Sequence, residues 1–176
     1  CSRKRRATIL KSEPVLSAGE KVVIFMGRKP MVEHWAADFR KRFDGATGWA
    51  VTGDDSARER DRVIDAFADC SGPAWLIGTG HSIGTSKDGM QCARLGVVAQ
   101  IPERAIHFFQ WTGRFDRHGG VGTEIWIPIA EGTQDDREVT RLTAAFGPIT
   151  QFVNAPELVA MAEKLDGVDD PTLIDS

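Results

Sequence analysis

Short apolar runs of strand length recur along the chain, separated by segments whose apolar residues follow a helical spacing. The clearest run covers residues 21–26 (KVVIFM) and has no polar position after its first lysine. Continuous runs of this kind are typical of strands buried on both faces of a parallel sheet. Further strands are predicted by shorter runs at residues 49–52, 74–77, 95–99 and 123–129.

Amphipathic helices are predicted between these strands. Pro30 can occupy the first turn of a helix, and Val32, Trp35, Phe39 and Phe43 after it form one apolar stripe. A serine followed three residues later by a glutamate gives a capping-box pattern at the start of the next helix. That helix is predicted over residues 56–67, and others over 102–117, around 139–146 and around 158–165.

The alternation of strands and helices predicts an α/β fold of three layers, with a mostly parallel central sheet and helices on both faces. Ligands of such folds bind beyond the carboxyl ends of the strands. The loops after residues 26, 52, 77 and 99 are therefore the candidate binding loops. We expect one domain over residues 21–166, preceded by an N-terminal arm or linker (1–20) and followed by an acidic flexible tail (167–176).

The charge of the chain is small overall but unevenly placed. The 22 lysines and arginines against 25 acidic residues give a net charge of -3 and no general attraction to nucleic acid. Basic residues fill positions 3–6, and aspartates gather at positions 166, 169, 170 and 175. We interpret both groups as solvated chain ends. Any contact with nucleic acid must then come from local arrangement.

Cysteine use predicts neither a metal site nor a disulfide framework. Cys1, Cys70 and Cys92 are far apart in the sequence, and the four histidines show no ligand spacing with them. No apolar run approaches membrane length, and no signal peptide is visible. We expect an intracellular protein, of the cytoplasm, nucleoid or nucleus, that does not bind a membrane.

Residues 110–117 (QWTGRFDR) place an amide and two guanidiniums close together. On a helix, Gln110, Arg114 and Arg117 fall in one stripe, and the aromatic residues at 108, 111 and 115 fall on the opposite side and can anchor it. Neighbouring arginines repel one another modestly, whereas a phosphate would bind both through bidentate hydrogen bonds. The alternative is that the arginines pair on the surface with Asp116 or Glu103.

The pattern Q-x-x-G-R-x-x-R resembles the sixth conserved motif of superfamily 2 helicases and translocases. The flanking stretch IPERAIHFFQWTGRFDRHGG is most similar to the Swi/Snf-like branch, and residues 88–91 (DGMQ) are similar to a variant in its phage-type members. The resemblance implies a RecA-like lobe whose Gln110, Gly113, Arg114 and Arg117 face an ATP bound on another lobe. It also implies that Arg114 and Arg117 are catalytic arginine fingers, which stabilise charge on the transferred phosphoryl group.

Other blocks follow in the order of the same family. KVVIFMGRKPMVEHWAADF resembles the fourth motif, and WLIGTGHSIGTSKDGMQCARLGVV resembles the fifth. The resemblance implies that these loops contact nucleic-acid phosphates, through Arg28 after the first strand and Thr79 and Ser82 in the fifth block. The fifth motif departs from its usual form from residue 85 to 91, and Asp116 stands where the branch favours His.

The phosphate-binding loop and the acidic box that a complete motor needs are missing from the sequence. We therefore expect the second motor lobe of an ATP-dependent DNA helicase or translocase. ATP and Mg²⁺ would be bound mainly by an N-terminal RecA-like lobe, in the same chain or in a partner chain. The isolated chain should be inactive, and its start at a residue other than Met favours a fragment over a subunit of a split motor.

Two other readings of the sequence remain open. The chain could be a RecA-like binding or regulatory module that docks a partner and never meets ATP. A Rossmann-like nucleotide-binding enzyme is the third reading, but it requires a glycine-rich turn after the first strand, and GRKP follows that strand instead.

Overall fold

The computed structural model describes residues 2–84, 88–115 and 120–152. Within these ranges, five parallel strands form one sheet in the order β2-β3-β1-β4-β5. The strands are β1 (Lys21–Met26), β2 (Thr47–Val51), β3 (Ala74–Thr79), β4 (Leu95–Val98) and β5 (Glu124–Trp126). The helices are α1 (Ser2–Ser17), α2 (Lys29–Arg42), α3 (Ala57–Asp69), α4 (Gly80–Ile83), α5 (Ala105–Thr112) and α6 (Gln134–Phe152).

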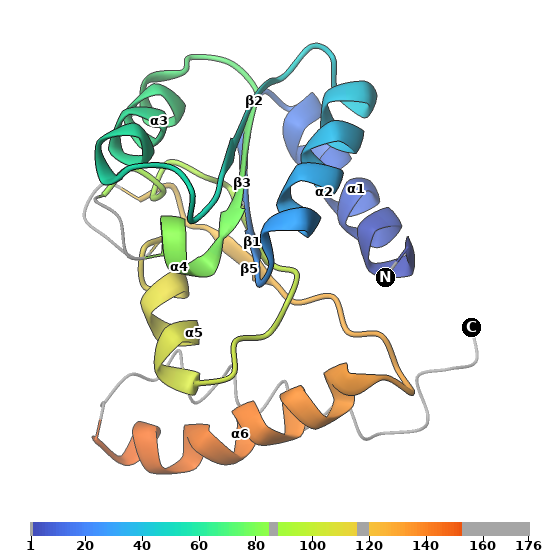
Figure 1. Ribbon diagram of the computed structural model, residues 1–176, viewed down its shortest axis with the longest axis vertical. Coiled ribbons are helices and arrows are strands. Elements are labelled where there is room, and N and C mark those ends of the chain that lie inside the picture. The colour runs from blue at the N-terminus through green and yellow to red at the C-terminus, as the bar shows by residue number, and fades with distance from the viewer. Residues whose placement is uncertain (1, 85–87, 116–119, 153–176) are drawn as a thin grey trace.

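Helices cover both faces of the sheet, as Figure 1 shows with α1 and α2 on one side and α3, α4 and α5 on the other. The strand β1 supplies both cores because successive side chains of a strand point to opposite faces. Val22, Ile24 and Met26 pack with α1 and α2, whereas Val23 and Phe25 pack with the helices opposite. The predicted three-layer α/β architecture with a parallel sheet is confirmed.

Helix α1 lies where the sequence pattern indicated an arm or linker over residues 1–20. It packs against the sheet through the buried Leu16, but its other buried side chains are polar: Lys4, Thr8 and Ser12. The Thr8 hydroxyl donates to the Lys4 carbonyl at 2.9 Å within the helix. A helix that buries so few apolar side chains leaves no hydrophobic stripe in the sequence, which is why the pattern missed it.

Local signals located most other elements within a few residues. Ser56 caps α3, its Oγ accepting a hydrogen bond from the Glu59 backbone N–H at 3.2 Å, and this confirms the predicted helix start. The strand expected over 123–129 is shorter and covers Glu124–Trp126. The helix expected around 158–165 and the acidic tail at 167–176 lie outside the described residues.

The helix predicted over residues 102–117 is much shorter than expected. Helix α5 begins at Ala105, after an extended Arg104, and ends at Thr112 with Gly113 as its C-cap. Pro102 does not open it, because Ile101 and Pro102 are themselves buried and lead the chain from β4 to α5. Arg114 therefore lies in the turn after the helix, and the predicted extent of the helix to residue 117 is wrong.

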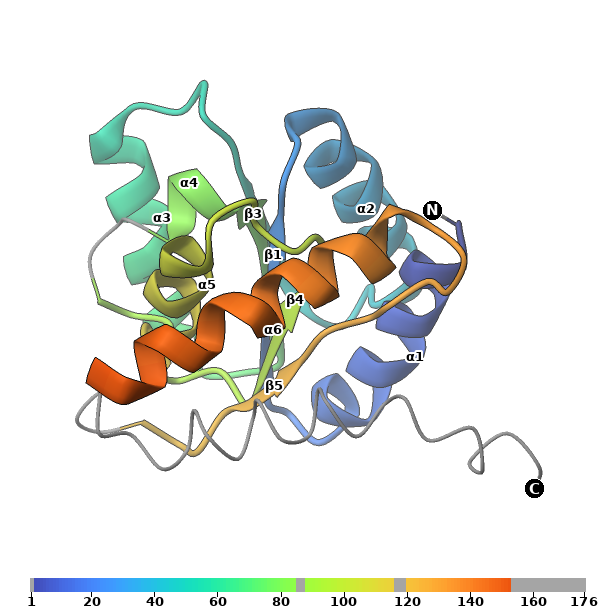
Figure 2. The ribbon, with the colours of Figure 1, turned by 90° about the horizontal axis from the view of Figure 1, so that it is seen from below.

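Helix α6 lies beyond one end of the sheet. It runs below the strands in Figure 1 and crosses in front of them in Figure 2, with its first turn near the start of α1. None of the helices in the described part of the chain is long and apolar enough to cross a membrane. Among the same residues, no group of three or more His, Cys, Asp or Glu side chains could hold a metal ion.

Candidate nucleotide-facing and nucleic-acid-facing site

The carboxyl ends of the five parallel strands meet at one edge of the sheet, so the loops that follow them open on the same side. Met26 at the end of β1 is paired in register with Thr79 at the end of β3. Adjacent strands lie about 4.8 Å apart. Arg28, two residues beyond Met26, and the segment that begins at Thr79 therefore share one edge, as the sequence predicted.

Arg28 is exposed and immediately precedes α2, in extended conformation with φ of -135° and ψ of 136°. Its neighbour Lys29 is held by an ion pair with Asp54 from the loop after β2. The hydrogen bond and negative charge of Asp54 raise the pKa of the Lys29 ammonium. The loops after β1 and β2 are thus in contact beside Arg28, through an ion pair on the surface.

The close approach of Gln100 to Gly27 ties the loop after β1 to the segment after β4. A Cβ atom at Gly27 would overlap the side-chain amide of Gln100, so a larger residue there would require the Gln100 side chain to move. The Gln100 Oε1 atom is buried and has no hydrogen-bond partner within the described part of the chain. Sequence reasoning missed this contact, for which the GRKP turn gave no signal.

Thr79 and Ser82 lie at the two ends of one turn. Thr79 is half-buried and forms the N-cap of α4, and its Oγ1 lies 2.5 Å from the Ser82 Oγ. Ser82 is 2% exposed. The structure thus brings the two predicted hydroxyls together, but it leaves Thr79 as the one a phosphate can reach without displacing α4. Their contact with nucleic acid stays a prediction.

Gln110 and Gly113 are exposed on α5 and at its end. A Cβ at Gly113 would lie 2.8 Å from the Phe109 carbonyl oxygen, so a larger residue would strain this helix end. Phe108, Trp111 and Phe115 are at most 7% exposed, which confirms the predicted anchoring side. The motif helix therefore presents polar groups outward from an aromatic base.

Arg114 is directed back onto the segment after β3. Its Nε donates to the Gly84 carbonyl oxygen at 3.0 Å, and its Nη1 lies 3.6 Å from Asp88 Oδ1. The side chain is 19% exposed, so part of the guanidinium still reaches solvent. Among the described residues, Arg114 forms its ion pair with Asp88 and not with Glu103; Asp116 lies outside the described residues. Arg117 lies outside the described residues.

Helices α4 and α5 pack through one aromatic ring. Trp111 stacks on Phe25 with a centroid separation of 5.6 Å and an interplanar angle of 13°. The same ring fills the space where side chains at Gly80 and Gly84 would project. In the sequence, the four-residue spacing of these glycines in GTGHSIG indicates a close approach of another group. It does not indicate that this group is the Trp111 ring.

Comparison with known proteins identifies the fold through similar solved structures. No family model and no curated protein matches the chain. The C-terminal domain of the DEAD-box protein Dbp5 superposes with a TM-score of 0.65 at 18% identity, covering 84% of this chain and 81% of that one. The fold is RecA-like.

Two further solved structures extend the likeness. The C-terminal part of the Fun30 ATPase domain gives a TM-score of 0.65 at 18% identity, over 79% of this chain and 44% of that one. Domain 2 of the DEAD-box helicase Mss116p, bound to an RNA duplex, gives 0.66 at 13% identity, over 81% of this chain and 55% of that one. This chain thus spans about half the length of these two structures.

Proposed function

We propose that this RecA-like domain is the second motor lobe of a superfamily 2 helicase or translocase of the Swi/Snf-like branch. Such an enzyme hydrolyses ATP while bound to nucleic acid, and the resemblance favours DNA over RNA. ATP would be bound mainly by an N-terminal RecA-like lobe, in the same chain or a partner. The likeness to C-terminal lobes of helicases supports the proposal at the level of fold.

The contact of Arg114 with Gly84 and Asp88 carries the proposal. It joins the segment that resembles the ATP-facing motif to the segment that resembles the nucleic-acid-contacting motif. Thr79, at the other end of α4, faces the edge where nucleic acid would lie. The four-residue helix α4 would thereby connect a change at the bound ATP to a change at the bound nucleic acid.

The chemistry asked of Arg114 is charge stabilisation. A guanidinium has five N–H donors in a planar fork, and the contacts to Gly84 and Asp88 occupy only part of that fork. The remaining donors would face the γ-phosphate, where negative charge develops during transfer. Gln110 and Gly113 would line the same surface. By the same resemblance, Mg²⁺ would neutralise the nucleotide phosphates on the other lobe.

A non-catalytic binding or regulatory module is the second candidate, because the same Arg114 contacts could serve only to hold the segment after β3. The two functions differ in which measurement an Arg114→Ala variant changes. A structural arginine affects folding and partner binding, whereas an arginine finger affects turnover.

The test compares Arg114→Ala with Arg104→Ala in the two-lobe enzyme. Arg104 is an exposed residue at the other end of α5 whose side chain makes no capping bond, so it loses the same charge without touching the proposed site. Turnover should fall by about 10³-fold or more in Arg114→Ala, with nucleotide affinity little changed, because ATP binds mainly elsewhere. Near-normal turnover in Arg114→Ala would favour the regulatory module.

A further inference from the structure

A shallow hollow of about 400 Å³, open to solvent, lies between the basic start of α1 and the side of α2 that carries Asp38. Its lining consists of Arg3, Arg5, Arg6, Ile9 and Asp38. Three arginines and one aspartate therefore line the hollow, in a chain whose net charge is -3. The positive charge here is local, and it opposes the charge of the molecule as a whole.

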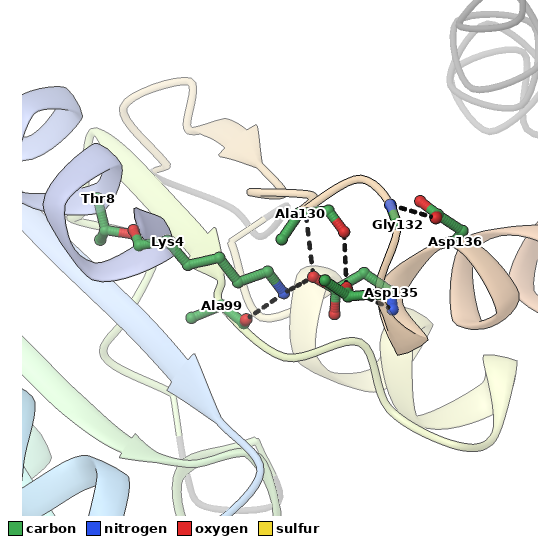
Figure 3. Close-up of polar contacts among 8 residues, drawn as sticks. Lys4, Thr8, Ala99, Ala130, Gly132, Asp135 and Asp136 are labelled. Atoms are coloured by element: carbon green, nitrogen blue, oxygen red, sulfur yellow. Dashed lines mark hydrogen bonds and ion pairs between the residues drawn. The ribbon is translucent and has the colours of Figure 1, made fainter. Parts of the chain in front are cut away.

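The arginines project from a helix that is fixed in place. The Lys4 ammonium is 7% exposed and lies 2.6 Å from Asp135 Oδ2 in the first turn of α6, and it donates to the Ala99 carbonyl oxygen at 3.2 Å (Figure 3). Asp135 Oδ2 also accepts a hydrogen bond from the Ala130 backbone N–H at 3.0 Å. This connection joins α1 to α6 and to the residue after β4, so the backbone that carries the neighbouring arginines is held in place.

The three arginines differ in how far they are already compensated. Arg5 Nη1 lies 2.8 Å from Asp38 Oδ2 on α2 and also contacts the His34 ring. Arg3 and Arg6 are exposed, and neither forms an ion pair with another residue in the described ranges. Arg5 thus fixes one wall of the hollow, and Arg3 and Arg6 supply its uncompensated charge.

The hollow opens near the same edge as Arg28. Lys4 touches Ala99, which directly follows β4, so the start of α1 lies at the carboxyl ends of the strands. Arg28 is the N-cap residue of α2. His34 and Asp38, the α2 residues that contact Arg5, lie six and ten positions further along the helix. At 1.5 Å per residue this separates Arg28 from the hollow by about 9–15 Å. One nucleic-acid strand advances about 3.4 Å per phosphate along a duplex, so the gap corresponds to roughly three or four phosphates.

We propose that this hollow binds the phosphate backbone of the nucleic-acid strand that leaves the Arg28 loop. The inference rests on the proposed function and adds Arg3 and Arg6 to its nucleic-acid surface. Guanidinium forks match phosphate oxygens, and an evenly charged backbone can meet Arg28 and the hollow together. An acidic peptide fits less well, because the described lining residues are three arginines, one aspartate and Ile9, so recognition rests on the guanidiniums and not on a pocket formed by several apolar side chains.

The test measures binding of the full chain to fluorescent single strands of DNA and RNA of one sequence over a range of salt concentrations. Arg3→Ala/Arg6→Ala should weaken binding to both strands and reduce the slope of log K against log salt by about 1.4, since each phosphate contact to a single strand contributes about 0.7. Arg3→Lys/Arg6→Lys should retain most of the slope, because the charge is kept.

Arg58→Ala/Arg62→Ala is the matched control. Both arginines are exposed on α3, across the sheet from the hollow, and their loss changes the net charge equally. The control should bind like the unaltered chain. A strand of two nucleotides should also be less sensitive to the Arg3/Arg6 change than one of twelve, because its one step of about 3.4 Å cannot span the roughly 9–15 Å between Arg28 and the hollow.

A parallel titration with poly-glutamate tests the acidic-peptide alternative. Three results would overturn the inference: equal effects of the two double variants, a salt slope unchanged by loss of Arg3 and Arg6, or a loss of poly-glutamate binding in Arg3→Ala/Arg6→Ala without loss of nucleic-acid binding. If Arg28→Ala weakens nucleic-acid binding while Arg3→Ala/Arg6→Ala does not, the hollow is excluded and the proposed function stands. Failure of the proposed function is detected separately, by normal ATP turnover in Arg114→Ala.

Discussion

The packing of Trp111 against Gly80 can be tested by a double-mutant cycle. All three of the nearest atoms that a Cβ at Gly80 would meet belong to the Trp111 ring. Trp111→Ala removes a ring that is 7% exposed and stacked on Phe25. Trp-to-Ala changes in cores cost about 3–5 kcal/mol, and the lost stacking lies within that range. In a chain of this size we expect the melting temperature to fall by roughly 6–20 °C.

Gly80→Ala alone should cost about 1–3 kcal/mol, because the new methyl group overlaps the indole ring. In the Trp111→Ala background the methyl group enters the vacated space, so the added cost should fall close to zero. The cycle therefore predicts a coupling free energy of about 1–3 kcal/mol, measured by denaturant unfolding of the four proteins. Gly45→Ala is the control, since a Cβ there meets nothing within 4 Å and should change stability by less than about 0.5 kcal/mol. Additive effects at Gly80 and Trp111 would refute the packing of α5 on α4 through this ring.

Four further outcomes follow from the contacts described above. Arg114→Lys should not restore ATP turnover in the two-lobe enzyme, because a flexible ammonium cannot keep the Gly84 contact and present a planar fork; recovery to more than about half would contradict this. The isolated chain should hydrolyse no ATP above background, and activity that copurifies with it and disappears in Arg114→Ala would be the opposite result. Lys4→Met should lower the free energy of unfolding by about 1–3 kcal/mol. The loss is smaller than for a fully buried ion pair because Asp135 is 18% exposed. Lys41→Met, on the surface of α2, is the control and should have little effect. Burial raises the pKa of the Cys92 thiol. The protonated thiol therefore contributes to the free energy of unfolding below the unfolded-state pKa, and this contribution is lost as pH rises through the higher folded-state pKa. At pH 8, alkylation of Cys92 measured by mass spectrometry should be slower in the folded chain than in urea.

The sequence predicted those elements whose stability comes from regular apolar patterns. The run at residues 21–26 is a strand whose side chains are buried alternately in the two cores. Because no polar residue interrupts it after Lys21, its apolar pattern predicted this strand directly. The pattern Ser56-x-x-Glu59 located the start of α3 because capping is a local interaction. Aromatic spacing likewise identified the buried side of α5, although not its length.

What the sequence could not predict depends on contacts between distant residues. Helix α1 is held by Lys4, whose partners Ala99 and Asp135 come from the end of β4 and from α6. Helix α4 lies in a stretch that a count of glycines assigns to a loop, and its glycines are needed because Trp111 occupies the space beside them. The burial of Ser82 follows from the same packing. Periodicity and spacing record none of these relations, since each depends on how the layers meet.

The arrangement of α4 places a physical constraint on how the proposed function would work. The Thr79 hydroxyl is engaged by Ser82 at one end of the helix, and the Gly84 carbonyl is engaged by Arg114 at the other. A phosphate that binds Thr79 competes for that hydroxyl, and any shift of α4 is transmitted to Gly84 because Trp111 leaves no free space beside the helix. Coupling between two sites requires an element with two arrangements that both sites bias. If this lobe is a motor lobe, α4 is the element to examine, and Thr79→Val should reduce stimulation of ATP turnover by nucleic acid more than it reduces the unstimulated rate. Equal reduction of both rates would show that Thr79 acts on folding or positioning alone.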